Sequence, residues 1–366
     1  MSTPAHRHWL DRAACAAARG HGLVSPNPAV GCVIVSSAGV LLAVARHRRC
    51  GDAHAEVNAL AIAGTAAHGA TAYVTLEPCS HTGRTGPCTQ ALIDAGIARV
   101  VIGGMDPAPH ALGGADVLRA GGIAVDLVDH QPSLDLNAPH RRRQLDSRPW
   151  VRCKWAQTLD GHVATRTGDS QWISSATSRR LVHRERGRVD AVLTGIGTVL
   201  ADDCRLTVRD VRARRIPMRV VIDRDLRTPP DSALVRTIDR APLLLVARGD
   251  ADASRRETLQ ATGARVLDMP CHVDGYFDLQ HVLRKLWTGF GIGDVLVEAG
   301  PRLMGALMAA HVVDELAVFI APRVLGDGAA LPALTGLVPP IIADGHAVRL
   351  IGVHQRAGDL LLRYMC

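Results

Sequence analysis

The stretch that decides the fold begins with His54-Ala55-Glu56 and closes with Pro78-Cys79 and, nine residues later, Cys88. One imidazole and two cysteine sulfurs are three of the four ligands of a tetrahedral zinc ion, and a catalytic zinc keeps its fourth position for water. Glu56 lies two residues from the proposed histidine ligand, where a carboxylate can handle the protons of that water. The stretch therefore predicts a catalytic zinc site.

A His-x-Glu followed by a Pro-Cys and a later Cys is typical of zinc deaminases. The separation of Cys79 and Cys88 exceeds the two intervening residues usual in those enzymes, and the insert 80–87 carries a histidine and an arginine. One alternative is a structural zinc site, but it needs a fourth Cys or His at ligand spacing, which the sequence does not offer. Another treats His54 as a helix cap and the cysteines as apolar filler. Glu56 and Pro78 both stand where the zinc-deaminase pattern has them relative to the three ligands, and this favours the catalytic site.

Length and composition indicate a globular protein of two domains. The chain has 366 residues, which is long for one hydrophobic core. Its 47% hydrophobic and 21% charged residues are ordinary values for a globular chain, and no run approaches the roughly 18–20 apolar residues of a membrane span. Charges and histidines interrupt the first 20 residues, so a signal peptide is not indicated and we expect a cytoplasmic protein.

The formal net charge of +7 suits either nucleic acid or a phosphorylated small molecule. Only 3% of the residues are aromatic and no basic stretch interleaves them, so base-stacking platforms are scarce and a nucleic-acid partner is disfavoured. We interpret the densest basic run, residues 140–143, as a solvated helix face. The nine cysteines are scattered over both halves, so we expect most to be reduced and a subset to bind metal.

Apolar runs and turn residues alternate along both halves, which implies a layered α/β sheet in each. In the first half we expect helices at 5–20, 54–64, 88–95 and 114–120, and strands at 29–35, 39–45, 70–76, 99–103 and 123–128. In the second half we expect helices at 174–188 and 301–310, and strands at 151–157, 190–194, 218–223, 242–247, 294–298, 315–320, 349–353 and 360–364. The apolar pattern breaks between Asp129 and Trp150, so the predicted domains are residues 1–147 and 148–366.

The zinc stretch resembles the deaminase half of the bifunctional riboflavin-biosynthesis deaminase/reductase family, in which the two cysteines are split by an insert of this kind. Further matches are Pro26-Asn27-Pro28-Ala29-Val30-Gly31, His47 with Gly51, and Asp106-Pro107. The resemblance implies a cytidine-deaminase-like three-layer α/β/α domain in which zinc is held by His54, Cys79 and Cys88. It also implies that Glu56 passes a proton from the water to the leaving amine, and that substrate is bound by Asn27, His47, His81 and Arg84.

The second half carries a pattern of its own after the strand expected at 190–194. Two glycines in Thr194-Gly195-Ile196-Gly197-Thr198-Val199 allow backbone amides to approach a phosphate, although a tight strand–helix turn explains them as well. The acids and arginines of residues 202–209 suit a ribose hydroxyl and a phosphate, or else a salt-bridged loop. A Gly-x-Gly-x-x-Gly does not follow this strand, so the Rossmann fingerprint is absent.

Together with residues 154–161, 168–174 and 297–301, these motifs resemble the reductase half of the same family, a domain similar to dihydrofolate reductase. The resemblance implies that the substrate site is lined by Lys154, Ser170, Trp172, Arg186, Asp202, Arg209 and Glu298. It implies that NADPH is bound by Thr158, Asp160, Gly195, Thr198 and Gly300. Three positions depart from the family. Gly86 and Cys204 stand where it has proline, and His140 stands where its linker usually has the phenylalanine of Asn-x-x-Phe.

The resemblance covers nearly the whole chain and implies two reactions. The first is zinc-dependent deamination of 2,5-diamino-6-(5-phosphoribosylamino)pyrimidin-4(3H)-one, and the second is reduction of the ribosyl group to ribityl by NADPH. It also implies one Zn2+ per chain and a homo-oligomer, either dimer or tetramer, without a nucleic-acid or membrane partner. Two alternatives stay open: a nucleic-acid base deaminase with an accessory domain, and a non-enzymatic, zinc-stabilised binding protein.

Overall fold

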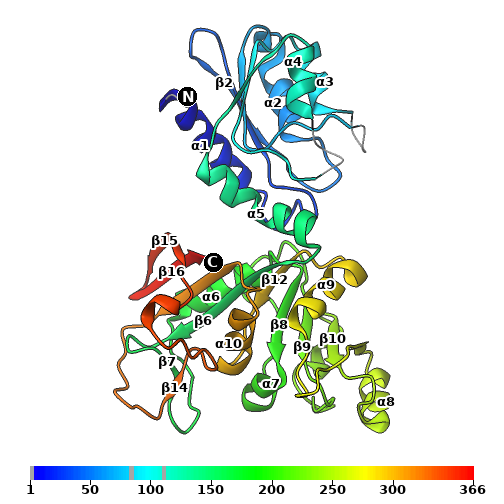
Figure 1. Ribbon diagram of the computed structural model, residues 1–366, viewed down its shortest axis with the longest axis vertical. Helices are drawn as coiled ribbons and strands as arrows, with labels where there is room; N and C mark the ends of the chain where they lie inside the picture. The colour runs from blue at the N-terminus through cyan, green and yellow to red at the C-terminus, as the bar shows by residue number, and fades with distance from the viewer. Residues whose placement is uncertain (1–3, 82–85, 109–112) are drawn as a thin grey trace. The chain divides into compact units, whose positions relative to one another are not determined.

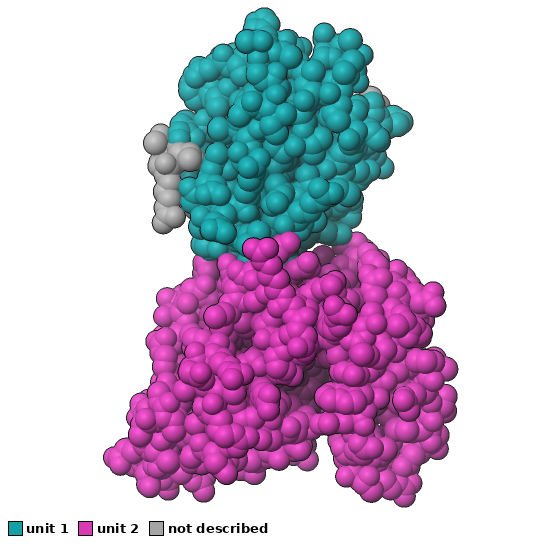
Figure 2. Space-filling model, turned by 180° about the vertical axis from the view of Figure 1, so that it is seen from behind, with its two compact units in different colours: residues 1–147 teal, residues 148–366 magenta. Residues whose placement is uncertain are grey.

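Two units make up the chain, residues 1–147 and residues 148–366, which Figure 2 draws in different colours. The computed structural model describes residues 4–81, 86–108 and 113–366. Within these ranges no helix combines the length and the apolar character that crossing a membrane requires. Each unit contains its own sheet (Figure 1), so the units are described one at a time.

Unit 1 is built on a five-stranded sheet in the order β2-β1-β3-β4-β5. β1 pairs antiparallel with β2 and β3, whereas β3, β4 and β5 run parallel. The strands expected at 29–35 and 39–45 therefore form an antiparallel hairpin. The strands are β1 (Gly31–Val35), β2 (Leu41–Arg46), β3 (Thr71–Val74), β4 (Arg99–Ile102) and β5 (Ala124–Leu127).

Helices cover both faces of this sheet, which gives three layers (Figure 1). Successive residues of a strand point to opposite faces, so Cys32 and Ile34 of β1 pack under one helical layer and Val33 and Val35 under the other. The first layer contains α2 (Ala55–Ala63), α3 (Cys88–Asp94) and α4 (Gly114–Ala120). The second contains α1 (Pro4–Ala18) and α5 (Gln131–Asp146).

The segment in which the apolar pattern breaks is a helix, α5, that sequence reasoning missed. Its buried residues recur at helical spacing but are polar: Ser133, Asn137, His140 and Arg143. Each forms side-chain hydrogen bonds, for example from Asn137 to the Thr75 carbonyl and between His140 and Asp106. The interpretation of residues 140–143 as a solvated face is therefore wrong for two of its four members, because a polar stripe replaces the apolar stripe that periodicity detects.

Unit 2 contains a nine-stranded sheet in the order β11-β10-β9-β8-β12-β6-β13-β16-β15. The strands from β11 to β13 run parallel, and β16 and β15 complete the sheet antiparallel. They are β6 (Trp150–Gln157), β8 (Ala191–Gly195), β9 (Met218–Ile222), β10 (Leu243–Ala247), β11 (Arg265–Asp268), β12 (Asp294–Val297), β13 (Glu315–Ile320), β15 (Arg349–Arg356) and β16 (Asp359–Met365).

The helices of unit 2 pack on both faces of its parallel strands. Leu193 and Val297 belong to one apolar cluster, and their neighbours Val192 and Leu296 belong to the cluster on the opposite face. The helices are α6 (Ala176–Arg186), α7 (Ile196–Asp202), α8 (Ala253–Ala261), α9 (Leu279–Phe290) and α10 (Pro301–Ala309). A separate antiparallel ladder joins β7 (His162–Ala164) to β14 (Leu331–Pro332). The α/β prediction for both halves is confirmed, whereas α7, α8, α9, β7, β11 and β14 were not predicted.

Candidate active sites in the two units

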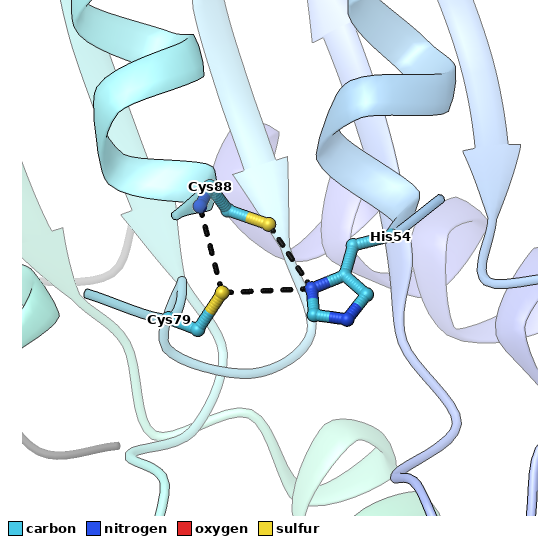
Figure 3. Close-up of side chains that lie close together, drawn as sticks. All are labelled: His54, Cys79 and Cys88. Carbon is cyan, nitrogen blue, oxygen red and sulfur yellow. Dashed lines mark hydrogen bonds between the residues drawn. The ribbon is translucent and has the colours of Figure 1, made fainter. Parts of the chain in front are cut away.

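Three residues from separate segments of unit 1 converge on one point (Figure 3). His54 precedes α2, Cys79 lies in the loop after β3, and Cys88 is the first residue of α3. His54 Nδ1 is 3.2 Å from Cys88 Sγ and 3.5 Å from Cys79 Sγ, and the three ligand atoms lie within 4.8 Å of one another. Zinc–sulfur and zinc–nitrogen bond lengths imply a separation of about 3.6 Å between such donors on a tetrahedron. The donor set therefore fits a zinc ion.

The contact between the two sulfurs favours a thiolate at Cys79. The pKa of Cys79 is lowered to about 4, first because the Cys88 thiol donates a hydrogen bond to it and then through His54. The pKa of Cys88 is raised by the same contact and by burial. The backbone N–H of Cys88 also points at Cys79 Sγ, 3.5 Å away, from the first turn of α3. A helix start stabilises thiolate, and Pro87 is the residue immediately before this helix.

Glu56 lies next to these ligands in the first turn of α2. Its side chain is buried, and one carboxylate oxygen, Oε2, has no hydrogen-bond partner among the described residues. Burial raises the pKa of Glu56 to about 7, because a charged carboxylate is costly away from water. A buried polar atom without a partner calls for an explanation, and a water on a bound zinc ion would provide one.

Two of the predicted substrate-binding residues lie beside the zinc ligands. Asn27 Nδ2 is 3.3 Å from His47 Nε2, and the His47 ring meets the His54 ring edge to face with 5.3 Å between centroids. His47 is buried, which lowers its pKa, and its Nδ1 is 3.1 Å from the Ala53 carbonyl. His81 is exposed, and Arg84 lies outside the described residues.

Glu77 is a site residue that sequence reasoning missed, although it directly precedes Pro78 and Cys79. Its Oε1 accepts a hydrogen bond of 2.9 Å from the N–H of Ala115 in the first turn of α4. One residue earlier, Gly114 lets the Pro78 carbonyl approach so closely that a Cβ there would lie 2.0 Å from its oxygen. The loop that carries the Cys79 ligand is thus fastened to α4. Position next to the Pro-Cys pair is the sequence signal that could have identified Glu77.

In unit 2 a cleft of about 2130 Å³ opens along the loops that follow the parallel strands, and Figure 2 shows this unit hollowed. All seven predicted substrate-binding residues line it: Lys154, Ser170, Trp172, Arg186, Asp202, Arg209 and Glu298. So do three of the predicted cofactor-binding residues, Gly195, Thr198 and Gly300. Arg224 and Arg227 also line the cleft and were missed, because loop arginines are common in this chain and carry no spacing signal. Arg205 lines the cleft as well and belongs to the stretch 202–209 that the sequence singled out.

The centre of the cleft holds one carboxylate and two cations. Glu298 accepts hydrogen bonds of 2.5 and 3.1 Å from Nε and Nη2 of Arg186, and Lys154 Nζ is 3.7 Å away. Burial would raise the pKa of Glu298, but the charges of Arg186 and Lys154 lower it to about 2. The carboxylate is therefore ionised at neutral pH, and the group as a whole is positive, which suits an anionic ligand.

Two helix starts face the same cleft. Gly195 precedes α7 and Gly300 precedes α10, and the Gly300 N–H donates a 3.1 Å hydrogen bond to Thr198 Oγ1. Free backbone N–H groups at the start of a helix bind phosphate. The expected tight strand–helix turn at residues 194–199 is present, and it places its first amides at the cleft.

The other two predicted cofactor residues, Thr158 and Asp160, do not line the cleft. Thr158 is buried, and its Oγ1 accepts a 3.0 Å hydrogen bond from the His162 N–H. The Asp160 carboxylate accepts hydrogen bonds of 3.0 and 2.7 Å from the N–H groups of Leu325 and Gly326. Their assignment to the cofactor site stays a prediction.

Fold and sites together define a chain with a zinc deaminase unit followed by a reductase unit. Residues 4–104 match the cytidine and deoxycytidylate deaminase zinc-binding region, and residues 149–361 match the RibD C-terminal domain. The riboflavin biosynthesis protein RibD of Escherichia coli K12 is 42% identical over 345 residues, 90% of this chain and 91% of that protein. The RibD protein of Aquifex aeolicus is 39% identical over 324 residues, 88% of each chain.

Two solved structures resemble the chain over nearly its full length. Acinetobacter baumannii RibD is 34% identical with a TM-score of 0.83, covering 99% of this chain and 98% of that one. A Thermotoga maritima diaminohydroxyphosphoribosylaminopyrimidine deaminase/5-amino-6-(5-phosphoribosylamino)uracil reductase is 30% identical with a TM-score of 0.82 at the same coverage. The chain belongs to the RibD family of bifunctional deaminase/reductases in riboflavin biosynthesis, as predicted from the sequence. His54, Cys79 and Cys88 form its zinc site.

Proposed function

We propose that unit 1 deaminates diaminohydroxyphosphoribosylaminopyrimidine and that unit 2 reduces the ribosyl group of the product, 5-amino-6-(5-phosphoribosylamino)uracil, with NADPH. The Thermotoga maritima relative is named for these two reactions. The observation that carries the proposal is the partnerless Oε2 of buried Glu56 beside the three zinc ligands.

In the first reaction the side chains around the ligands move protons and hold the ring. When bound, the zinc ion supplies a Lewis acid that makes water acidic near neutral pH. Glu56 accepts a proton at Oε2 and returns it to the amino group that leaves as ammonia. The paired side chains of Asn27 and His47 offer a donor and an acceptor to the pyrimidine edge. His81, which is exposed, and Arg84 are assigned to the rest of the substrate.

The variant Glu56→Gln tests this step, because it keeps the shape of the side chain and removes its basicity. We expect zinc content to stay at one per chain while ammonia release falls by about 10²–10⁴-fold, the usual contribution of a general base. Reduction of the uracil substrate should be unchanged. Asp116→Asn, which alters an exposed carboxylate of α4, is the matched control. Ammonia release that survives in Glu56→Gln contradicts the proposed role.

In the second reaction the task of the protein is alignment, since NADPH supplies the hydride. We assign the phosphates of the cofactor to the helix starts at Gly195 and Gly300, and the phosphate of the substrate to Arg209. Arg209 Nη1 donates to Thr207 Oγ1 at 3.0 Å, which orients its guanidinium. Lys154 and the Arg186–Glu298 pair contact the ribosyl group in this assignment, with Ser170, Trp172 and Asp202 around it. Thr158 remains a candidate for the NADPH site.

We attribute a preference for NADPH over NADH to arginines at the carboxyl end of β9. Arg224 and Arg227 line the cleft there. Arg224 donates to Asp225 and to the Gly275 carbonyl, whereas the exposed guanidinium of Arg227 donates no hydrogen bond within the described part of the chain. A guanidinium suits the 2′-phosphate that distinguishes NADPH.

Arg227→Gln should lower kcat/KM for NADPH by about tenfold, the value of a charge-assisted contact. The value for NADH should stay the same. Arg240→Gln, an exposed arginine outside the cleft lining, serves as control. Equal losses with both nicotinamides would speak against a 2′-phosphate contact.

We further propose that the chain forms a homo-oligomer, either dimer or tetramer. β15 is the last strand of its sheet, and Leu350, Ile351 and Val353 on it are exposed. An apolar edge strand is a site at which another strand pairs. Light scattering should give a mass of at least two chains, and Val353→Lys should reduce it. A monomeric wild-type chain at micromolar concentration would refute the proposal.

We place the protein in the cytoplasm, because Cys79 and Cys88 must stay reduced to bind zinc. Cell fractionation tests this placement. Recovery of the native protein from an oxidising compartment would contradict it.

A further inference from the structure

Two segments far apart in sequence are fastened together beside the reductase cleft. One is the hairpin, residues 158–169, which contains β7, and the other is the strap, residues 323–335, which contains β14. Figure 1 shows β7 and β14 side by side, with Leu331 opposite Ala164 and Pro332 opposite His162. The short ladder is only the middle of a longer series of contacts.

At one end of the series, the hairpin turn holds the start of the strap. The Leu159 N–H donates a 2.7 Å hydrogen bond to the Arg323 carbonyl. The Asp160 carboxylate accepts the N–H groups of Leu325 and Gly326 at 3.0 and 2.7 Å, and its hydrogen bonds to Thr158 and to these amides lower its pKa. One carboxylate therefore holds two consecutive backbone amides of the strap.

A second polar contact joins the hairpin to the strap. Arg166 donates from Nε to Asp327 Oδ2 at 2.6 Å and from Nη2 to Oδ1 at 2.5 Å, which is the parallel two-bond geometry of an Arg–carboxylate pair. Asp327 Oδ1 also accepts the Ala329 N–H at 2.9 Å, so the carboxylate is fixed to its own turn. The guanidinium is 64% exposed, which limits the strength of the pair.

These contacts stand outside the cleft, but the segments they hold form its wall. Asp160, Arg166 and Asp327 do not line the cleft. Gly168 at the end of the hairpin and residues 170–174 directly after it do, and so do residues 331–333 and 335 of the strap. The strap ends on α10, where the Thr335 N–H donates to the Pro301 carbonyl at 3.2 Å. Gly305 lies so close that a Cβ there would be 1.8 Å from the Thr335 carbonyl oxygen. The strap thus spans from the hairpin to a helix whose start faces the cleft.

We propose that Asp160 and the Arg166–Asp327 pair are positioning residues of the reductase, which clasp the strap to the hairpin and so fix the cleft wall that NADPH contacts. Asp160 acts through the strap amides and does not touch the cofactor. The inference rests on the proposed binding of NADPH in this cleft. It also replaces the direct cofactor contact that resemblance implies for Asp160.

The test compares Asp160→Ala, Arg166→Gln and Asp327→Asn with their combinations in the full, zinc-loaded chain. We expect Asp160→Ala to raise KM for NADPH about tenfold, as loss of a charge-assisted contact does. The two variants of the exposed pair should raise it at most about fivefold. In all of them kcat should stay within about threefold, because the wall binds ground state and transition state alike. Ammonia release by unit 1 should not change.

Combining the substitutions distinguishes a clasp from a cofactor ligand, because the effects of residues that act together do not add. Asp160→Ala combined with Asp327→Asn should cost no more than Asp160→Ala alone, since a released strap has nothing further to lose. The charge reversal Arg166→Asp with Asp327→Arg should return KM to within about twofold of the wild-type value, as expected if the pair acts only by joining two loops. The inference would be overturned if the effects of the two substitutions on KM multiplied, if the charge reversal did not restore KM, or if only Asp160→Ala changed KM.

Hydrogen exchange of the backbone amides, measured without ligand, tests the clasp independently of NADPH binding. The strap amides of Leu325 and Gly326 should exchange faster in Asp160→Ala than in the wild-type chain. Unchanged exchange refutes the clasp even where NADPH binding is intact. If the wild-type cleft does not bind NADPH, the proposed cofactor is wrong, while the exchange experiment still decides whether the clasp exists.

Discussion

In unit 1 the three zinc ligands lie within 4.8 Å of one another, whereas in unit 2 the predicted site residues are spread along a cleft of about 2130 Å³. A metal ion needs a few donors at fixed separations and tolerates little displacement. A dinucleotide and a phosphorylated sugar need many contacts, none of which is decisive alone. Function is therefore concentrated in a few atoms of unit 1 and distributed over loops and helix starts in unit 2. Single substitutions should accordingly affect the two activities to different degrees.

The largest expected effect is the loss of a zinc ligand. Cys88→Ser should release zinc and lower ammonia release by about a thousandfold or more, since the metal contributes several kcal/mol. Reduction by unit 2 should stay within about twofold. Metal analysis and the two activity assays check this, with the exposed Cys15→Ser as the matched control. Retained zinc together with retained deamination would show that the ligand set is wrong.

The same contrast explains what could be predicted from the sequence. His54, Cys79 and Cys88 were predictable because ligand chemistry ties residue type to position along the chain. Most strands were predictable because they are continuous apolar runs. Helix α5 was not, since the residues on its buried face, such as Asn137 and Arg143, are polar.

The remainder depends on contacts without a sequence signature. Asp160 meets backbone amides of residues 325 and 326, and amides are present at every position other than proline. Glu77 reaches Ala115 on a helix 38 residues later. The approach of Pro78 to Gly114 is likewise a product of tertiary packing. Such pairings arise from the folded chain, so spacing along the sequence does not reveal them.

In unit 2 the largest effect of a single change is expected at the buried charge centre. Glu298→Gln leaves Arg186 and Lys154 with one neutral partner, and removal of one charge from a buried pair typically costs about 3–5 kcal/mol. The variant should unfold at lower temperature and reduce its substrate about a hundredfold more slowly. Ammonia release should be unaffected. A stability equal to that of the wild-type chain would show that the centre is not tightly coupled.

The charge of Glu298 also predicts a pH dependence of the stability of unit 2. Its pKa is about 2 in the folded chain, below the ordinary value of 4.5, so the folded state binds fewer protons than the unfolded state between these values. The resulting stability, about 3 kcal/mol, is fully present above pH 4.5 and is lost as the pH falls toward 2. Thermal unfolding of unit 2 should therefore show the difference between wild type and Glu298→Gln shrinking from pH 6 to pH 3. A constant difference would contradict the assignment.

The smallest effects are expected from substitution of two glycines that contact the site loops, and these effects test the contrast between the two units most directly. Gly114→Ala presses on the carbonyl of Pro78, beside the Cys79 ligand, and Gly305→Ala presses on Thr335 at the end of the strap. Each substitution forces a backbone shift that costs about 1–3 kcal/mol.

Because zinc geometry tolerates less displacement than a cleft wall, Gly114→Ala should lower zinc affinity and ammonia release about tenfold, the lower end of such effects near a metal. Gly305→Ala should only raise KM for NADPH about threefold, a small change in uniform binding. Gly289→Ala in α9, where a Cβ meets nothing within 4 Å, controls for the added methyl group. Equal losses in the two units would mean that loop placement matters as much for the cleft as for the metal.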